Sequence, residues 1–182
     1  TPLYSSAASD VYKRQGGEIY SYWASNTPVW NNTATGLFDI QSDNSFGYYY
    51  YTQPTFNNAG TLKKTNSTGT TNFYAQLNNT GNVNVESGTL NLRGGGTNSG
   101  DITVNDGAAI AFSGGNYELT GGSLTADNLS VNGANVSATG GTVNEINNLT
   151  VGSGSLTLNE SSNSFNVVAV NGGVLVLNTT TS

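Results

Sequence analysis

The sequence of 182 residues contains no cysteine, no methionine and no histidine. The absence of cysteine excludes disulfide bonds and thiolate metal sites, but it does not exclude secretion. The absence of histidine excludes His-based catalytic triads, imidazole metal ligands and the commonest general base. The absence of methionine, including an initiator, is what we expect of a piece cut from a longer open reading frame.

Positive charge is also scarce, with five Lys and Arg against eleven Asp and Glu and a formal net charge of −6. A surface so poor in cations can neutralise few phosphates, which argues against nucleic-acid binding and against attachment to anionic lipid. No continuous apolar run is long enough to span a bilayer. We therefore expect no nucleic-acid partner and no direct membrane span.

Two of the five cations lie in residues 5–15, which read "SSAASDVYKRQ". This stretch resembles the translation of an adaptor used in sequencing libraries. The resemblance implies that residues 1–15 are not native, and that residues 16–182 are a repeat fragment that is incomplete at both ends. We therefore expect residues 1–15 to make few contacts with the remainder and to lack its periodic core.

The rest of the chain is rich in Asn, Thr and Gly, and it places aliphatic residues at regular intervals. One pattern, which we call the frame, consists of apolar-x-apolar, a short turn with Gly, and a second apolar-x-apolar. It recurs as "VNVESGTLNL", "ITVNDGAAIAF", "LSVNGANVSA", "LTVGSGSLTL" and "VAVNGGVLVL". The starts of these frames are separated by 19, 27, 20 and 19 residues. A second register, apolar-Asn-x-x-Gly, appears in "FNNAG", "LNNTG" and "TNSG", with a looser earlier member at Trp30. Both patterns indicate an internal repeat.

Each alternating run is typical of a short strand with one buried face. The runs are joined by Gly and Asn turns instead of connections long enough for a helix. Because a two-strand unit cannot bury its apolar face alone, neighbouring units must stack. The sequence therefore predicts an all-β fold, a parallel β-helix (β-solenoid) with about 20 residues per coil. In it Val83 pairs with Ile102, and Leu149 pairs with Val168.

This arrangement makes further predictions about the interior. We expect one inward column formed by the five frame starts, Val83, Ile102, Leu129, Leu149 and Val168. The long interval before Leu129 is expected to hold extra strand in residues 117–124, as a bulged coil or an outward loop. Asn side chains at stacked corners are expected to form amide ladders along the axis. The coil at residues 174–177 is expected to expose its strand edge and to promote self-association.

Several segments carry a family resemblance. The stretches "GLFDIQSDNS", "FNNAGTLKKTNSTGTT" and "LNNTGNVNVESGTLNLRGGGTNSGDITVNDGA" resemble the β-strand repeat regions of very large bacterial secreted proteins. The stretch "GSLTLNESSNSFNVVAVNGGVLVLN" is similar to the autotransporter-associated β-strand repeat. The resemblance implies a single-stranded, right-handed β-helix, outside the cell or at its surface and outer-membrane-associated in the parent protein. It also implies further coils of the same parent chain, and it brings no catalytic residues.

Few residues offer chemistry. Asp101 and Asp106 are the one close acidic pair in the repeats, and Arg93 is the nearby candidate base, but acids in Gly-flanked turns are usually solvated. The calcium-binding nonapeptide G-G-x-G-x-D is approached by residues 94–98, which lack its spaced Gly and its Asp. We therefore predict no catalytic residues, no metal site and no cofactor.

The binding candidates are aromatic: Tyr48, Tyr49, Tyr50, Tyr51 and Trp30. Tyrosines on an exposed sheet can stack on sugar rings or pack against a partner, and aromatic residues are enriched in binding hot spots. A structural interpretation stays open, in which some of these rings point inward or cover the end of the coil.

Two hypotheses about function follow. The first is a non-enzymatic structural or interaction module, part of a stalk or an adhesin-like passenger, that contacts cell-surface glycans or other surface proteins. The alternative is a carbohydrate-binding or polysaccharide-active β-helix. An active enzyme of that kind would need a cleft with convergent carboxylates and a basic residue.

Overall fold

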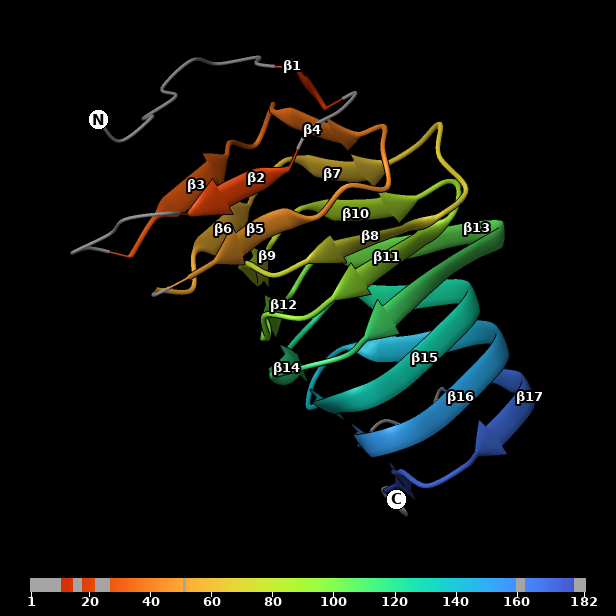
Figure 1. The fold of residues 1–182 in the computed structure, drawn as a ribbon. Helices are drawn as coiled ribbons and strands as arrows, with labels where there is room; N and C mark the ends of the chain where they lie inside the picture. Colours follow the sequence, from red (N-terminus) through yellow and green to blue (C-terminus); the bar gives the residue numbers. More distant parts are fainter. Residues whose placement is uncertain (1–10, 15–17, 22–26, 51, 160–162, 179–182) are drawn as a thin grey trace.

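The computed structural model describes residues 11–14, 18–21, 27–50, 52–159 and 163–178. These residues form 18 strands and no helix, and the strands pair in parallel from one coil to the next. Figure 1 shows the coils stacked from the N-terminal end of the chain to its C-terminal end. The stack has about seven turns of roughly 20 residues each. The prediction of an all-β parallel solenoid is confirmed.

Each complete coil has three strands, so the solenoid has three faces. The first face contains the predicted pair Val83 and Ile102, which are register partners. Its strands are β1 (Val11–Arg14), β4 (Leu37–Ile40), β7 (Thr61–Lys64), β10 (Asn82–Val85), and the first parts of β13 (Asp101–Phe112), β15 (Ser123–Ala138) and β16 (Thr142–Leu158).

The second face contains the other predicted pair, Leu149 and Val168. Its strands are β2 (Ile19–Ser21), β5 (Phe46–Tyr49), β8 (Thr70–Phe73), β11 (Thr89–Leu92), later parts of β13, β15 and β16, and β17 (Phe165–Val170).

The third face follows the second register of the sequence, with its Asn-rich strands. Its strands are β3 (Val29–Asn32), β6 (Thr55–Asn58), β9 (Gln76–Asn79), β12 (Gly96–Asn98), β14 (Asn116–Leu119), the ends of β15 and β16, and β18 (Val174–Leu177).

The prediction of a single inward column is wrong beyond Ile102. The column of Val83 and Ile102 continues to Leu124 on the first face, whereas Leu129 follows Ile110 on the second face. The two faces carry the same alternation of apolar residues, so the longer interval marks a change of face. Residues 117–124 are neither a bulge nor an outward loop, because Tyr117 lies in β14 and Leu124 in β15, both in regular register.

Aromatic rings fill the interior of the N-terminal coils. The rings of Phe46 and Phe73 stack with centroids 4.6 Å apart, and Phe56 meets Phe73 edge to face at 5.5 Å. Later coils are filled mainly by aliphatic side chains such as Leu129 and Val151. Burying one such side chain contributes about 1.5–3 kcal/mol relative to leaving it exposed. The stacked interior is therefore one continuous hydrophobic core.

A ladder of buried amides runs along the third face, and we call Asn32, Asn58, Asn79 and Asn98 the inner Asn ladder. The Nδ2 of each of the first three members donates to the Oδ1 of the next member at 2.7 Å. All four also donate to a glycine carbonyl at the following corner, as Asn98 does to Gly100 at 2.7 Å. This buried amide ladder lies at the strand ends of the apolar-Asn-x-x-Gly register, whereas the sequence placed an amide ladder at the corners that follow the frame starts.

The N-terminal end of the stack includes part of the segment that resembles an adaptor. Val11–Arg14 form β1 and pair with β4 over four residues, so the expectation of few contacts is wrong for this segment. An open strand edge can add a neighbouring strand by backbone hydrogen bonds alone, so this pairing does not bear on the origin of residues 1–15.

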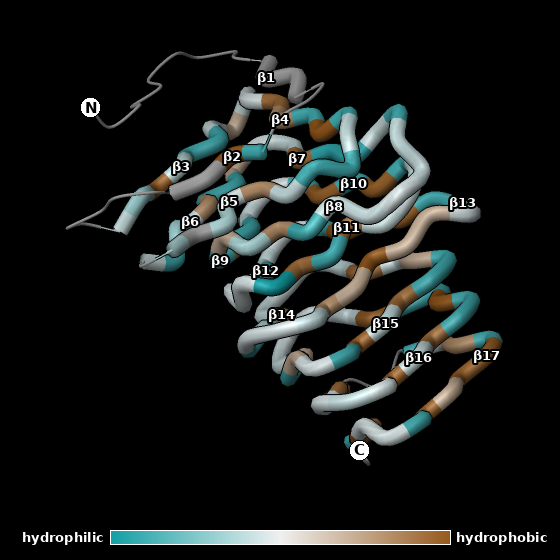
Figure 2. The backbone as a smooth tube through the Cα atoms, viewed as in Figure 1, coloured by the Kyte–Doolittle hydropathy of each residue, from teal (hydrophilic) through white to brown (hydrophobic). Residues whose placement is uncertain are grey.

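At the other end, β17 and β18 pair only with β16 among the described residues. Val168 is 45 % exposed and Leu177 53 % exposed, although their partners one coil earlier, Leu149 and Leu158, are buried. Figure 2 shows β17 as a largely apolar segment. The expected exposed edge at Val174–Leu177 is confirmed.

Candidate functional site

The five aromatic candidates do not form one group. Trp30 is half-buried and packs against the core, with its ring 5.1 Å from that of Phe46. Tyr48 is 44 % exposed and Tyr50 is 70 % exposed. The side chain of Tyr49 and all of Tyr51 lie outside the described residues. The structure therefore leaves Tyr48 and Tyr50 as the candidates that reach solvent.

Tyr48 belongs to a short surface row that the sequence analysis did not assemble. Its ring meets that of Tyr74 edge to face at 5.1 Å, and the Arg93 guanidinium lies over the Tyr74 ring at 5.4 Å. We call these three residues the aromatic strip. Tyr74 and Arg93 directly follow the second-face strands β8 and β11, so they occupy the same position in adjacent coils. That shared position was visible in "NFY" and "NLR".

The loop after β5 is tied to this region. The side-chain amide of Gln53 donates to the carbonyl of Tyr74 at 3.1 Å and to that of Gly94 at 2.8 Å. These two bonds connect the loop to the next two coils at the corner between the second and third faces. The strip is therefore held in place by backbone contacts as well as by its ring contacts.

A groove follows the third face, parallel to the solenoid axis, and we call it the axial groove. Its volume is about 460 Å³. Its floor is the register column of Gly96, Tyr117 and Val136. Burial raises the pKa of the Tyr117 hydroxyl above its usual range, so this phenol stays neutral. Its walls are two outward columns, one of Gln76, Asn116, Asn135 and Ser155 and the other of Thr97, Glu118, Ser137 and Thr157.

The walls are hydrogen-bonded along the axis. Asn135 donates to the Oδ1 of Asn116 at 3.1 Å, and the Ser155 hydroxyl donates to the Oδ1 of Asn135 at 3.0 Å. In the opposite wall, Glu118 accepts a hydrogen bond at 3.3 Å from the hydroxyl of Thr139, which lies beyond the groove lining. These bonds order the side chains and leave amide and hydroxyl groups facing the groove.

The two acids that the sequence singled out, Asp101 and Asp106, lie in different surroundings. Asp101, at the start of β13, accepts hydrogen bonds from the backbone N–H and the hydroxyl of Ser123, at 2.9 and 2.8 Å. Asp106 instead lines a separate hollow of about 810 Å³ that also contains Glu86, Asp127 and Glu145. No Lys or Arg is among the described residues that line this acidic hollow, although Lys63 forms an ion pair with its Glu86. The pair therefore does not converge on a basic residue.

Asp127 is the best-satisfied carboxylate of the acidic hollow. It accepts hydrogen bonds from Asn147 at 2.8 Å, from the Gly107 N–H at 2.8 Å and from Asn128 at 2.9 Å. These bonds, with that from Asn147 the most important, hold the pKa of Asp127 below its usual range. Within the described part of the chain, no group of three or more acids is placed to hold a metal ion.

No protein-family model, curated protein or solved structure matches this chain. Among the described residues, no helix is long and apolar enough to cross a bilayer. The site must therefore be judged from the geometry of its own residues.

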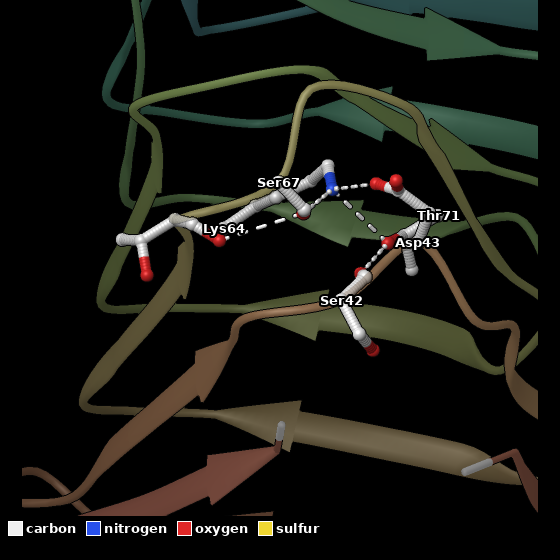
Figure 3. Close-up of polar contacts among 6 residues, drawn as sticks. Ser42, Asp43, Lys64, Ser67 and Thr71 are labelled. Atoms are coloured by element: carbon white, nitrogen blue, oxygen red, sulfur yellow. Dashed lines mark hydrogen bonds and ion pairs between the residues drawn. The ribbon is translucent and has the colours of Figure 1, made fainter. Parts of the chain in front are cut away.

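One buried charged cluster remains, and Figure 3 shows it. The Lys64 side chain is fully buried, in the inward column between Ile40 and Val85. Its Nζ donates to Ser67 at 2.7 Å, to Asp43 at 3.1 Å and to Thr71 at 3.2 Å. The three donors of the ammonium group thus have three acceptors, one of them anionic.

The electrostatics of this cluster favour the ionised form of Asp43. Burial opposes ionisation of Asp43, but the hydrogen bonds from Lys64 and Ser67 and the Lys64 charge outweigh it, so the pKa of Asp43 is lowered. An ammonium paired with an ionised carboxylate has no free lone pair with which to act as a base. The cluster therefore holds the loop between β7 and β8 against the loop after β4.

Proposed function

We propose that this chain is a structural and interaction module of a large exported bacterial protein, in the manner of a stalk or an adhesin-like passenger. The observation that carries the proposal is that the buried side chains of the described residues connect successive coils. The inward columns, the inner Asn ladder and the Lys64 cluster all join one coil to the next. An architecture in which each coil contacts its neighbours can be extended by adding coils, as a spacer requires.

The outer surface supports an interaction role more than a catalytic one. Apart from Glu118, uncharged side chains line the axial groove, and the cation that contacts the acidic hollow, Lys63, is held in an ion pair with Glu86. A polysaccharide-cleaving site would need carboxylates and a base converging on one bond. The proposed partners are cell-surface glycans or other surface proteins, and the proposed location is the cell surface or the medium.

Display on a bacterial surface tests this function. The chain, with an N-terminal epitope, is placed between a secretion signal and an outer-membrane anchor, and intact cells are stained for the epitope and treated with protease. We expect an accessible epitope and a protease-resistant solenoid. A Gly96→Val variant is the matched control, because a Cβ at Gly96 would collide with the Leu77 carbonyl and disturb the stack. A wild-type chain that stays inside the cell, or is degraded like the control, would contradict the proposal.

A further inference from the structure

We propose that the axial groove binds an extended, uncharged oligosaccharide, with the sugar chain parallel to the solenoid axis. This inference rests on the proposed interaction function and deepens it, because it assigns the glycan contact to one groove and to one class of glycan. It rests on the shape of the groove, the chemistry of its walls and the aromatic strip, which precedes Gln76 and Gly96 across the corner between the second and third faces.

The spacing of the coils matches such a ligand. Asn116, Asn135 and Ser155 are register partners in three successive coils, so their side chains recur about every 4.8 Å. The repeat of an extended pyranose chain is close to this distance. Each sugar unit can therefore meet an equivalent pair of walls, one coil after another.

The walls have the hydrogen-bonding character that sugar hydroxyls need. A hydroxyl both donates and accepts, and the amides of Asn116 and Asn135 and the hydroxyls of Ser137 and Thr157 do the same. The bonds along the near wall order these groups before a ligand arrives, which lowers the entropic cost of binding.

The charge of the region favours a neutral glycan. Glu118 is the one charged side chain among the described residues that line the groove. The protein as a whole carries a net charge of −6. An acidic polysaccharide would meet the Glu118 carboxylate in a groove whose described lining contains no Lys or Arg, and would therefore be repelled.

The aromatic strip supplies the apolar contact. Tyr74 precedes Gln76 by two residues, and Arg93 precedes Gly96 by three, across the same corner. Tyrosine rings can stack on the apolar faces of sugars, and the Arg93 guanidinium over Tyr74 fixes one of these rings. A sugar chain leaving the groove at Gln76 would reach this strip.

An extended peptide fits the groove less well. Peptides commonly join a sheet through an unpaired strand edge, but β12 is paired with β9 and β14, and β14 with β12 and β15. The groove lies across the face of these strands and offers no free backbone edge.

Affinity gel electrophoresis and titration calorimetry test the proposal on the full chain. The probes are cellohexaose, xylohexaose, maltohexaose and soluble neutral polysaccharides, with polygalacturonate as the charged comparison and an unstructured peptide as the protein comparison. We expect binding to at least one neutral glycan and none to polygalacturonate. Binding to the peptide alone, or to none of the neutral glycans, would overturn the proposal.

Two variants of β15 locate the site. Ser137→Arg places a long side chain in the groove beside Glu118, and Ser130→Arg makes the same change on the outward side of the second face. We expect Ser137→Arg to weaken binding by about tenfold or more, and Ser130→Arg to leave it unchanged. Equal loss in both variants, or loss only in Ser130→Arg, would place the ligand elsewhere and overturn the proposal.

The strip is tested in the same way. Tyr74→Ala should weaken binding several-fold, whereas Tyr50→Ala, which removes an exposed tyrosine outside the strip, should not. Thermal unfolding of each variant separates loss of the ligand contact from loss of the fold. Unchanged affinity in a folded Tyr74→Ala protein would remove the strip from the site. Surface display can succeed whether or not this binding is found, so the two proposals fail separately.

Discussion

Leu119 occupies in β14 the register position that Asn98 occupies in β12. The inner Asn ladder therefore ends at Asn98, and the same inward column continues with Leu119, Ala138 and Leu158. Polar and apolar side chains thus fill one column at different heights of the same solenoid.

The position of a residue in the ladder should determine the cost of replacing it. Asn79→Ala removes an acceptor from Asn58, a donor from Asn98 and the bond to Gly81, so we expect a loss of about 2–3 kcal/mol in the free energy of unfolding. Asn98→Leu, at the apolar end, should cost about 1 kcal/mol. Chemical denaturation measures both values. Asn78→Ala, which removes the neighbouring side-chain bond from Asn78 to the Oδ1 of Asn57, is the control and should cost no more than about 0.5 kcal/mol. Equal losses at all three positions would contradict this prediction.

The two partners of the buried ion pair should respond differently to replacement. Lys64→Met removes the charge and leaves an apolar side chain of similar length in an apolar column, so we expect a change within about 1 kcal/mol. Asp43→Ala leaves the buried ammonium without its anion. Because Asp43 is 47 % exposed, solvent screening reduces the loss to about 1–2 kcal/mol. Denaturant titration compares the two, and a Lys64→Met protein less stable than Asp43→Ala would contradict the prediction.

The stability of the solenoid should fall in acid through Asp43. Its pKa is lowered from 3.8 in the folded protein. Asp43 therefore binds a proton less readily in the folded state than in the unfolded state. Its contribution to the free energy of unfolding is fully present above the unfolded pKa. This contribution is lost as the pH falls from 3.8 through the lowered pKa of Asp43 in the folded protein. Denaturation midpoints between pH 7 and pH 2 measure this, and Asp43→Asn should give a flatter acid limb. An unchanged limb in that variant would exclude Asp43 as a cause.

The glycine corners should tolerate a methyl group only where no backbone opposes it. A Cβ on Gly81 would collide with the carbonyl oxygen of Gly60, one coil away. We expect Gly81→Ala to destabilise the protein by about 1–3 kcal/mol, because two backbone segments must shift. At Gly152 the nearest atom is the flexible side-chain oxygen of Asn132, at 3.2 Å, so Gly152→Ala should be nearly neutral. Thermal melts of the two variants test the contrast, which equal melting temperatures would refute.

The exposed coil of β17 and β18 should promote self-association. Val168 and Leu177 continue inward columns but are about half exposed. Unpaired strand edges with apolar side chains associate readily. We expect light scattering to show mass that rises with concentration, and Val168→Lys with Leu177→Lys to reduce it. Thr150→Lys, outward on the second face, is the control. A monodisperse monomer at all concentrations would contradict the prediction.

The sequence predicted strand pairs better than it predicted the cross-section. Val83 with Ile102 and Leu149 with Val168 followed from the repeat alone. The number of faces did not, because the first and second faces alternate apolar and polar residues in the same way. Ile102 and Leu129 therefore seemed to continue one column although they lie on different faces.

The candidate site was predictable only in part. The sequence named Tyr48 as an aromatic candidate without showing which of the tyrosines faces outward, and Tyr74 and Arg93 join it only when the coil register is known. The axial groove has no local signature, because its walls come from five successive coils. Lys64 likewise replaces an apolar residue in "TLKK", and its burial depends on Asp43 in the preceding coil.

The parallel register also has a mechanical consequence. The backbone hydrogen bonds between coils run along the axis. Tension applied along that axis therefore pulls on these bonds in their own direction, and adjacent coils separate one after another. Because each coil is held only by its neighbours, the stack should unwind from an end. Each step would release roughly 20 residues of chain. Such a molecule yields to force in many small extensions and dissipates a sudden pull.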